Sequence, residues 1–119
     1  MKKTLILGAS PDPNRFAYRA AHMLADYGHE IVLVGIKNGE VAGQKILKGT
    51  PYVEHVHTVT LYVGPPNQKD LIDYIIGLKP ERIIFNPGTE NDELIKLAEK
   101  NQIDPVIGCT LVMLSAGTY

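Results

Sequence analysis

Short apolar runs that alternate with helical patterns constrain the fold of this chain more than any other feature of its sequence. Runs this short and continuous are typical of parallel strands that are covered on both faces. The strand patterns cover residues 4–8, 30–35, 58–63, 82–86 and 104–108. The helical patterns cover residues 15–27 and 67–77, and a third follows the capping sequence at residues 89–92.

This alternation predicts an α/β fold: a three-layer Rossmann-like sandwich with a five-stranded parallel sheet of order 3-2-1-4-5. A chain of 119 residues and 13.1 kDa suits one domain, which we expect to span residues 1–119. Residues 36–57 are less regular, with one short extended piece expected at 41–47. The form of the apolar segment 109–114 stays open.

Composition excludes several classes of protein. A net charge of -1 argues against a general nucleic-acid-binding surface, which needs a dense basic face. One cysteine excludes an internal disulfide and a zinc site built from several cysteines. The first apolar run ends at Gly8, too short for a secretory signal, and no run reaches the length of a membrane helix. We therefore expect a cytoplasmic protein without a membrane partner.

Charge is distributed unevenly along the chain. Residues 1–48 hold seven Lys or Arg and four Asp or Glu, whereas residues 49–119 hold five and nine. The net charge is therefore +3 in the first part and -4 in the second. This split reflects either chance charge on helix surfaces or a first part that meets an anion.

Glycines stand at or beside four predicted strand ends, namely Gly8, Gly35, Gly64 and Gly88. Ligands of parallel sheets bind beyond the carboxyl ends of the strands, at the switch point of the strand order. The predicted order places that point between strands 4–8 and 82–86. The glycines either let a ligand approach the backbone or only form tight turns.

The turn after the first strand is the best candidate for a phosphate site. A helix that starts after Gly8-Ala9-Ser10 offers free N–H groups, Ser10 adds a hydroxyl and Arg15 adds a guanidinium. The turn lacks the later glycines of a dinucleotide fingerprint, and Lys37 follows the second strand where an NAD-binding protein has an acid. These features favour a more highly phosphorylated nucleotide than NAD.

The run Gly8-Ala9-Ser10-x-x-Pro13-Asn14-Arg15-x-x-Tyr18-Arg19 resembles the small stand-alone bacterial CoA-binding proteins, which are related to the CoA-binding domain of succinyl-CoA synthetase. The resemblance covers nearly the whole chain. It departs at Gly35-Ile36, where many relatives have Asn-Pro. It implies coenzyme A or an acyl-CoA lying across the carboxyl ends of the strands.

The resemblance also implies which residues meet the ligand. The turn at Gly8 would hold the pyrophosphate, Arg15 would meet a phosphate, and Lys37 would lie near the 3′-phosphate. The turn at Val63 would contact the adenine or the pantetheine, and the turn at Asn86 would line the far side. The full predicted set is Gly8, Ala9, Ser10, Asn14, Arg15, Tyr18, Gly35, Lys37, Val63, Gly64, Pro65, Asn86, Pro87 and Gly88.

No catalytic motif stands out, so the leading hypothesis is non-catalytic binding of coenzyme A or an acyl-CoA. One alternative is an NAD(P)-binding redox sensor or oxidoreductase module. Another is an assembly module that has lost its ligand, in which residues 111–114 either form a homodimer contact or close the core. His55 and His57 are strand residues or metal ligands, and Cys109 is a small buried side chain or a thiol near the pantetheine.

Overall fold

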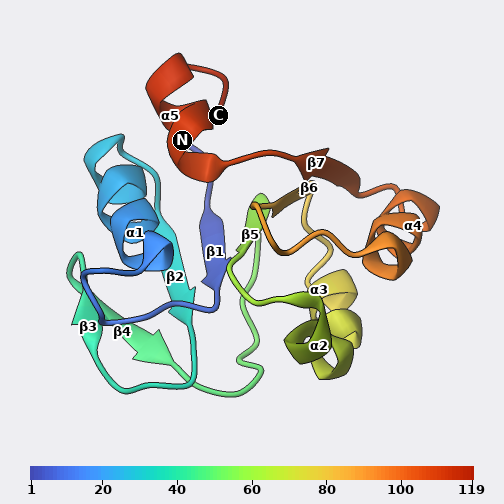
Figure 1. Cartoon of the computed structure of the whole chain (residues 1–119), viewed down its shortest axis with the longest axis horizontal. Coiled ribbons are helices and arrows are strands. Elements are labelled where there is room, and N and C mark those ends of the chain that lie inside the picture. The colour runs from blue at the N-terminus through green and yellow to red at the C-terminus, as the bar shows by residue number, and fades with distance from the viewer.

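The computed structural model describes residues 1–119 and shows a mostly parallel sheet with helices on both faces (Figure 1). The strands are β1 (Thr4–Leu7), β2 (Ile31–Val34), β3 (Glu40–Val41), β4 (Gln44–Leu47), β5 (Thr58–Leu61), β6 (Arg82–Phe85) and β7 (Asp104–Ile107). The helices are α1 (Phe16–Asp26), α2 (Pro65–Gln68), the 3₁₀ turn η1 (Lys69–Leu71), α3 (Ile72–Gly77), α4 (Asp92–Lys100) and α5 (Thr110–Ala116).

The prediction of an α/β fold with a mostly parallel sheet is confirmed, but the predicted strand count and order are wrong. The sheet has seven strands in the order β3-β4-β2-β1-β5-β6-β7. The strand predicted at 58–63 pairs directly with β1, with Leu7 opposite Leu61. The neighbour of β2 on the side away from β1 is instead β4, and Leu33 of β2 lies opposite Ile46 of β4.

The segment between β2 and β5 explains this difference. It folds into the antiparallel hairpin β3–β4, whose turn at Ala42 and Gly43 has positive φ angles. Four of the six residues in the two strands are exposed and both strands are short, so the sequence carries little apolar periodicity there. As a result, the switch point lies between β1 and β5, not between β1 and β6.

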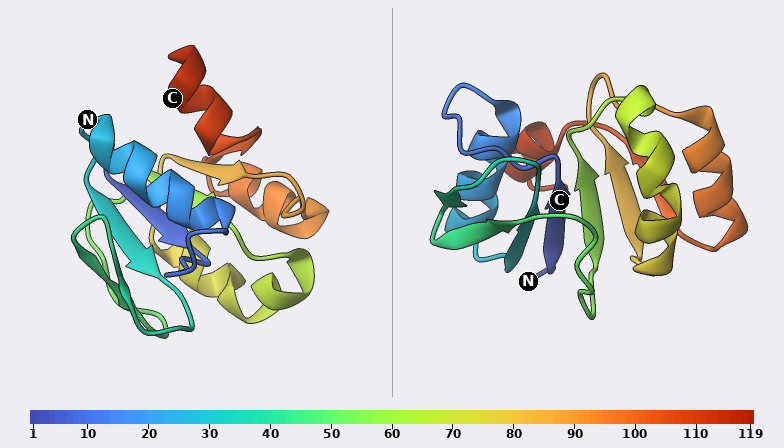
Figure 2. Two further views of the ribbon diagram at one scale, coloured as in Figure 1. Left: turned by 60° about the vertical axis from the view of Figure 1, so that its left-hand side comes forward. Right: turned by 90° about the horizontal axis from the view of Figure 1, so that it is seen from below.

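Two apolar cores cover the two faces of the sheet, which makes the fold three-layered (Figure 2). Strand β1 contributes to both, because alternate residues point to opposite faces. Leu5 and Leu7 pack with Ile75 of α3 and Leu94 of α4. Ile6 packs on the other face with α1 and α5. Consecutive turns after β1 and β5 therefore lead to helices on opposite faces.

The segment 109–114, whose form the sequence left open, enters helix α5, which lies beside α1 (Figure 1). Thr110 and Leu114 are its buried residues, and Gly117 ends it with a left-handed φ of 75°. A helix begins after the predicted capping sequence, but its cap is Asn91, which accepts from the N–H groups of Glu93 and Leu94, whereas the Thr89 hydroxyl donates to the Asn86 carbonyl oxygen. None of the helices has the length and apolar character needed to cross a membrane.

Candidate functional site

A cleft of about 960 Å³ opens at the carboxyl ends of β1, β2, β5 and β6. Two walls flank the switch point. The residues predicted for the site that line the first wall are Gly8, Ala9, Ser10, Arg15, Gly35 and Lys37. Those that line the second wall are Val63, Gly64, Pro87 and Gly88. The cleft lies at the upper end of the ~300–1,000 Å³ range typical of small-molecule sites.

The other predicted site residues do not line the cleft. Asn14 is exposed on the turn before α1, and Pro65 starts α2 outside the lining. Tyr18 packs its ring against His22 of the same helix, with centroids 4.7 Å apart. Asn86 is only 2% exposed and directs its polar atoms into the protein. These four residues therefore lie outside the lining of the cleft.

The backbone of the first turn differs from the expected cradle of free N–H groups. The amides of Gly8 and Ala9 both donate to the carbonyl oxygen of Val34, at 2.9 and 3.0 Å. They join β1 to β2 and are not available to a ligand. The glycine at position 8 serves packing, because its φ is +97° and an added Cβ would lie 2.8 Å from the carbonyl carbon of Tyr62.

The start of α1 supplies the donors that this turn lacks. Arg15 precedes the helix in an extended conformation, and no side chain caps the first turn. The first N–H groups of a helix have no partner within it, so those of Phe16 and Ala17 remain for a ligand on the cleft wall. The Ser10 hydroxyl accepts from the N–H of Asp12 at 3.1 Å and keeps its own proton to donate.

The charge on the first wall comes from Arg15 and Lys37. The Arg15 side chain is 71% exposed, and its Nε lies 3.9 Å from a carboxylate oxygen of Asp12. That ion pair is long and solvated, so the guanidinium retains most of its attraction for a phosphate. The site therefore offers helix N–H groups, a hydroxyl and two cations to an anionic ligand, which fits the phosphates of a nucleotide.

Comparison with known proteins gives the family. Residues 2–115 match the family described as CoA binding domain. The chain belongs to this family. The sequence resemblance to CoA-binding proteins is thereby confirmed, and membership supports a CoA-binding role. No curated protein matches the chain.

Solved structures share the fold of this CoA-binding domain. A crystal structure of an uncharacterized protein is 60% identical, with a TM-score of 0.98 over 100% of this chain and 98% of that one. A Thermus thermophilus protein is 21% identical, with a TM-score of 0.86 over 99% and 90% of the two chains. A hypothetical protein from Pyrococcus horikoshii is 26% identical, with a TM-score of 0.84 over 97% and 82%.

A buried glutamine holds the second wall of the CoA-binding domain together. The Gln68 side-chain amide donates to the carbonyl oxygens of Val63, at 2.9 Å, and Thr89, at 2.8 Å. Its own oxygen accepts from Asn91 at 2.9 Å. Gln68 is fully buried, and it joins the turn after β5 to the turn after β6. The spacing of these cleft-lining turns therefore depends on Gln68.

Asn86 ties the same wall to helix α5. Its amide nitrogen donates to the Thr60 hydroxyl at 2.7 Å and to the Leu61 carbonyl oxygen at 2.8 Å. Its side-chain oxygen accepts from the N–H of Thr110 at 2.9 Å, and its main-chain oxygen accepts from Thr89. Because these groups are already paired within the protein, Asn86 orders the wall.

Tyr62 follows β5 and also lines the cleft. Its hydroxyl is buried and has no hydrogen-bond partner within the normal distance and angle limits. Burial, with a further contribution from the nearby Cys109, raises the pKa of Tyr62 well above its usual range. The phenol therefore stays neutral and carries no charge into the cleft.

Sequence reasoning missed several lining residues, chiefly Phe16, Ile36, Asn67, Asp70, Leu71 and Thr89. A signal existed for Phe16 and Ile36, since each directly adjoins a predicted site residue in the sequence. Asp70 and Leu71 lie beyond the short helix α2, in the turn η1. The prediction considered only residues directly after the strand ends, and Asp70 and Leu71 lie further along the chain from the end of β5.

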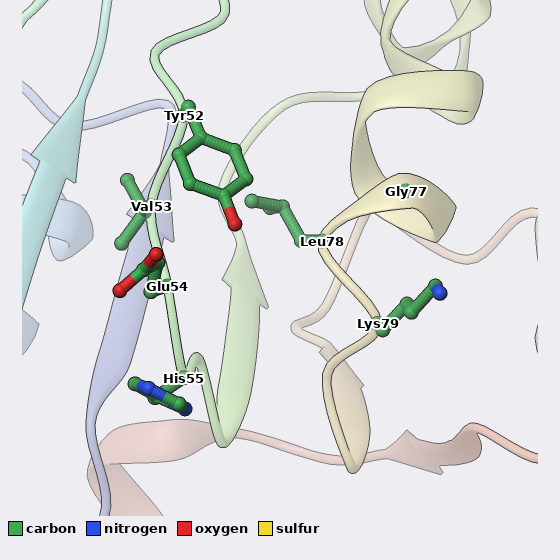
Figure 3. A pocket seen from close by; sticks show the side chains of 7 residues that line it. All are labelled: Tyr52, Val53, Glu54, His55, Gly77, Leu78 and Lys79. Carbon is green, nitrogen blue, oxygen red and sulfur yellow. The ribbon is translucent and has the colours of Figure 1, made fainter.

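A smaller hollow of about 400 Å³ lies at the opposite edge of the sheet, before β5 and β6 (Figure 3). Tyr52 and Glu54 line one side, and Lys79 lies across from them. The Lys79 ammonium points away from Glu54 and His55, so the polar groups do not converge on a ligand (Figure 3). The chain has no cluster of three or more His, Cys, Asp or Glu arranged to hold a metal ion.

Proposed function

We propose that this chain binds coenzyme A or an acyl-CoA in the cleft at the carboxyl strand ends, without catalysing a reaction on it. The observation that carries the proposal is the first wall. There the uncapped start of α1, the Ser10 hydroxyl and the Arg15 side chain face one cavity. These groups suit a pyrophosphate, and membership of the CoA binding domain family supports the same ligand.

The proposed contacts differ from those that sequence reasoning placed on the first turn. The pyrophosphate lies against the N–H groups of Phe16 and Ala17 and the Ser10 hydroxyl, with Arg15 beside it. Lys37, at the end of the same wall, meets the 3′-phosphate of the adenosine. The rest of the ligand extends along the second wall, past Val63 and Gly64.

Among the glycines that line the cleft, Gly64 is the one whose conformation and surroundings do not require glycine. Its φ is -71°, and an added Cβ would meet no atom closer than 3.8 Å. Gly88 has a positive φ of 90°, so the turn itself requires glycine there. The lack of a side chain at Gly64 leaves the backbone open to close approach by a ligand, which supports its place in the proposed contact set.

Titration calorimetry with coenzyme A, acetyl-CoA, dephospho-CoA and NADPH tests the proposal. We expect coenzyme A to bind, dephospho-CoA to bind more weakly, and NADPH not to displace coenzyme A. Failure of both coenzyme A and acetyl-CoA to bind would refute the proposed function. Tighter binding of NADPH than of coenzyme A would favour the NAD(P)-binding alternative. Equal affinity for dephospho-CoA would remove the 3′-phosphate contact from the proposal.

A further inference from the structure

The charged side chains that line the cleft are divided between its walls. The cations Arg15 and Lys37 belong to the first wall, and Asp70 of η1 is the one charged residue on the second. No other charged residue lines the cleft. The net charge is +3 in residues 1–48 and -4 in residues 49–119. The cations that line the cleft come from the first of these segments, and its one lining acid comes from the second.

A second carboxylate lies beside the same wall. Glu90 accepts a hydrogen bond from the N–H of Gly88 at 2.8 Å, which holds its side chain next to a lining residue. Lys69 adjoins Asp70 in the sequence but does not line the cleft. The apolar side chains of Val63, Leu71 and Pro87 supply much of the remaining surface of this wall.

We infer that the second wall selects acyl groups that do not end in a carboxylate. This inference rests on the proposed function, in which the phosphates occupy the first wall. An acyl chain that extends along the second wall meets Leu71 and Val63, which favour an uncharged hydrocarbon. A terminal carboxylate would face Asp70 there with no cation on the wall to pair with it.

Butyryl-CoA and succinyl-CoA form the matched ligand pair for the test. Both carry a four-carbon acyl group, and they differ in the terminal carboxylate. We expect butyryl-CoA to bind the intact chain about two- to fivefold more tightly than succinyl-CoA at low ionic strength. Added salt should reduce this ratio, because the repulsion acts between partly solvated charges.

Two variants separate Asp70 from general surface charge. Asp70→Asn should lower the ratio of the two affinities toward one, because it removes the one carboxylate that lines the cleft. Asp73→Asn removes an exposed acid of α3 that does not line the cleft and should leave the ratio unchanged. Asp70 is itself exposed, so its replacement should not affect folding.

The outcomes distinguish this inference from the function on which it rests. If coenzyme A and butyryl-CoA bind but succinyl-CoA binds equally well, the inference is wrong and the proposed function stands. A preference that persists undiminished in Asp70→Asn also overturns the inference. If none of the ligands binds, the proposed function itself fails.

Discussion

The carbonyl oxygen of Ala9 lies where the side chain of any residue other than glycine would begin at position 35. A Cβ built on Gly35 would lie far inside van der Waals contact with that oxygen, and close to Ile46 as well. The same segment is fixed by the bonds from Gly8 and Ala9 to Val34. The close packing of the turns after β1 and β2 thus shapes the floor of the cleft.

Gly35→Ala should therefore destabilise the protein by about 3 kcal/mol, because the Ala9 carbonyl would have to move and strain the turn. Denaturant unfolding measures this change. Gly77→Ala is the matched control, since position 77 has open space and an ordinary helical backbone. It should leave the stability unchanged or raise it by up to about 1 kcal/mol. Equal stability of the two variants would contradict the argument.

Replacement of Gln68 should open the second wall. Gln68→Leu leaves the Val63 and Thr89 carbonyl oxygens and the Asn91 amide without partners, at a cost of about 2–3 kcal/mol. Coenzyme A affinity should also fall, measured at a temperature at which the variant is folded. Gln44→Leu, at an exposed position of β4, should change neither quantity appreciably. Unchanged affinity in Gln68→Leu would show that the spacing of the turns does not affect binding.

The sequence revealed the strands and the first turn because these features are local. Apolar runs mark β1 and β2 directly, and the motif around Arg15 carries the family resemblance. The strand order, in contrast, depends on a contact between segments that are not adjacent in the sequence. Strand β4 pairs with β2 through only Ile46 and Leu47, and the segment that holds β4 has little apolar pattern. A hairpin of that size leaves almost no periodicity to detect.

Buried polar residues were the second limit on sequence reasoning. Asn86 follows a strand end, as a ligand-binding residue does, yet Thr60 and Thr110 from distant parts of the chain already satisfy it. Asp70, in contrast, was not predicted as a site residue, yet it lines the cleft. It reaches the cleft because α2 is a single turn. Both outcomes depend on contacts between segments far apart in the sequence.

Arg15 and Lys37 should contribute separately to binding. Arg15→Ala should weaken binding of coenzyme A and dephospho-CoA alike, by about 1–2 kcal/mol, because both ligands carry the pyrophosphate. Lys37→Ala should weaken coenzyme A alone, since dephospho-CoA lacks the 3′-phosphate. Calorimetry with both ligands gives the comparison. Lys45→Ala, on β4 and outside the cleft lining, is the control and should affect neither ligand. Equal losses of affinity for both ligands in Lys37→Ala would show that Lys37 does not act through the 3′-phosphate.

Two histidines at the amino edge of the sheet should make stability depend on pH. Partial burial, together with the positive charges of Lys2 and Arg82, lowers the pKa of His29. Its Nδ1 also accepts from the N–H of Lys2 at 2.9 Å, a bond that protonation would break. Partial burial lowers the pKa of His57 as well, and Glu81 opposes that effect only in part.

The sign follows from these depressed pKa values. The unfolded chain binds protons at His29 and His57 near pH 6.5, whereas the folded chain binds them only at lower pH. Their contribution to stability is therefore complete above pH 6.5 and is lost as the pH falls through the folded pKa values. Melting temperatures recorded from about pH 7.5 to about pH 5.5 should fall less steeply for the double variant His29→Gln, His57→Gln than for the unchanged chain. His22→Gln, on the exposed face of α1, should keep the full slope. Parallel curves for the double variant and the unchanged chain would contradict the assignment.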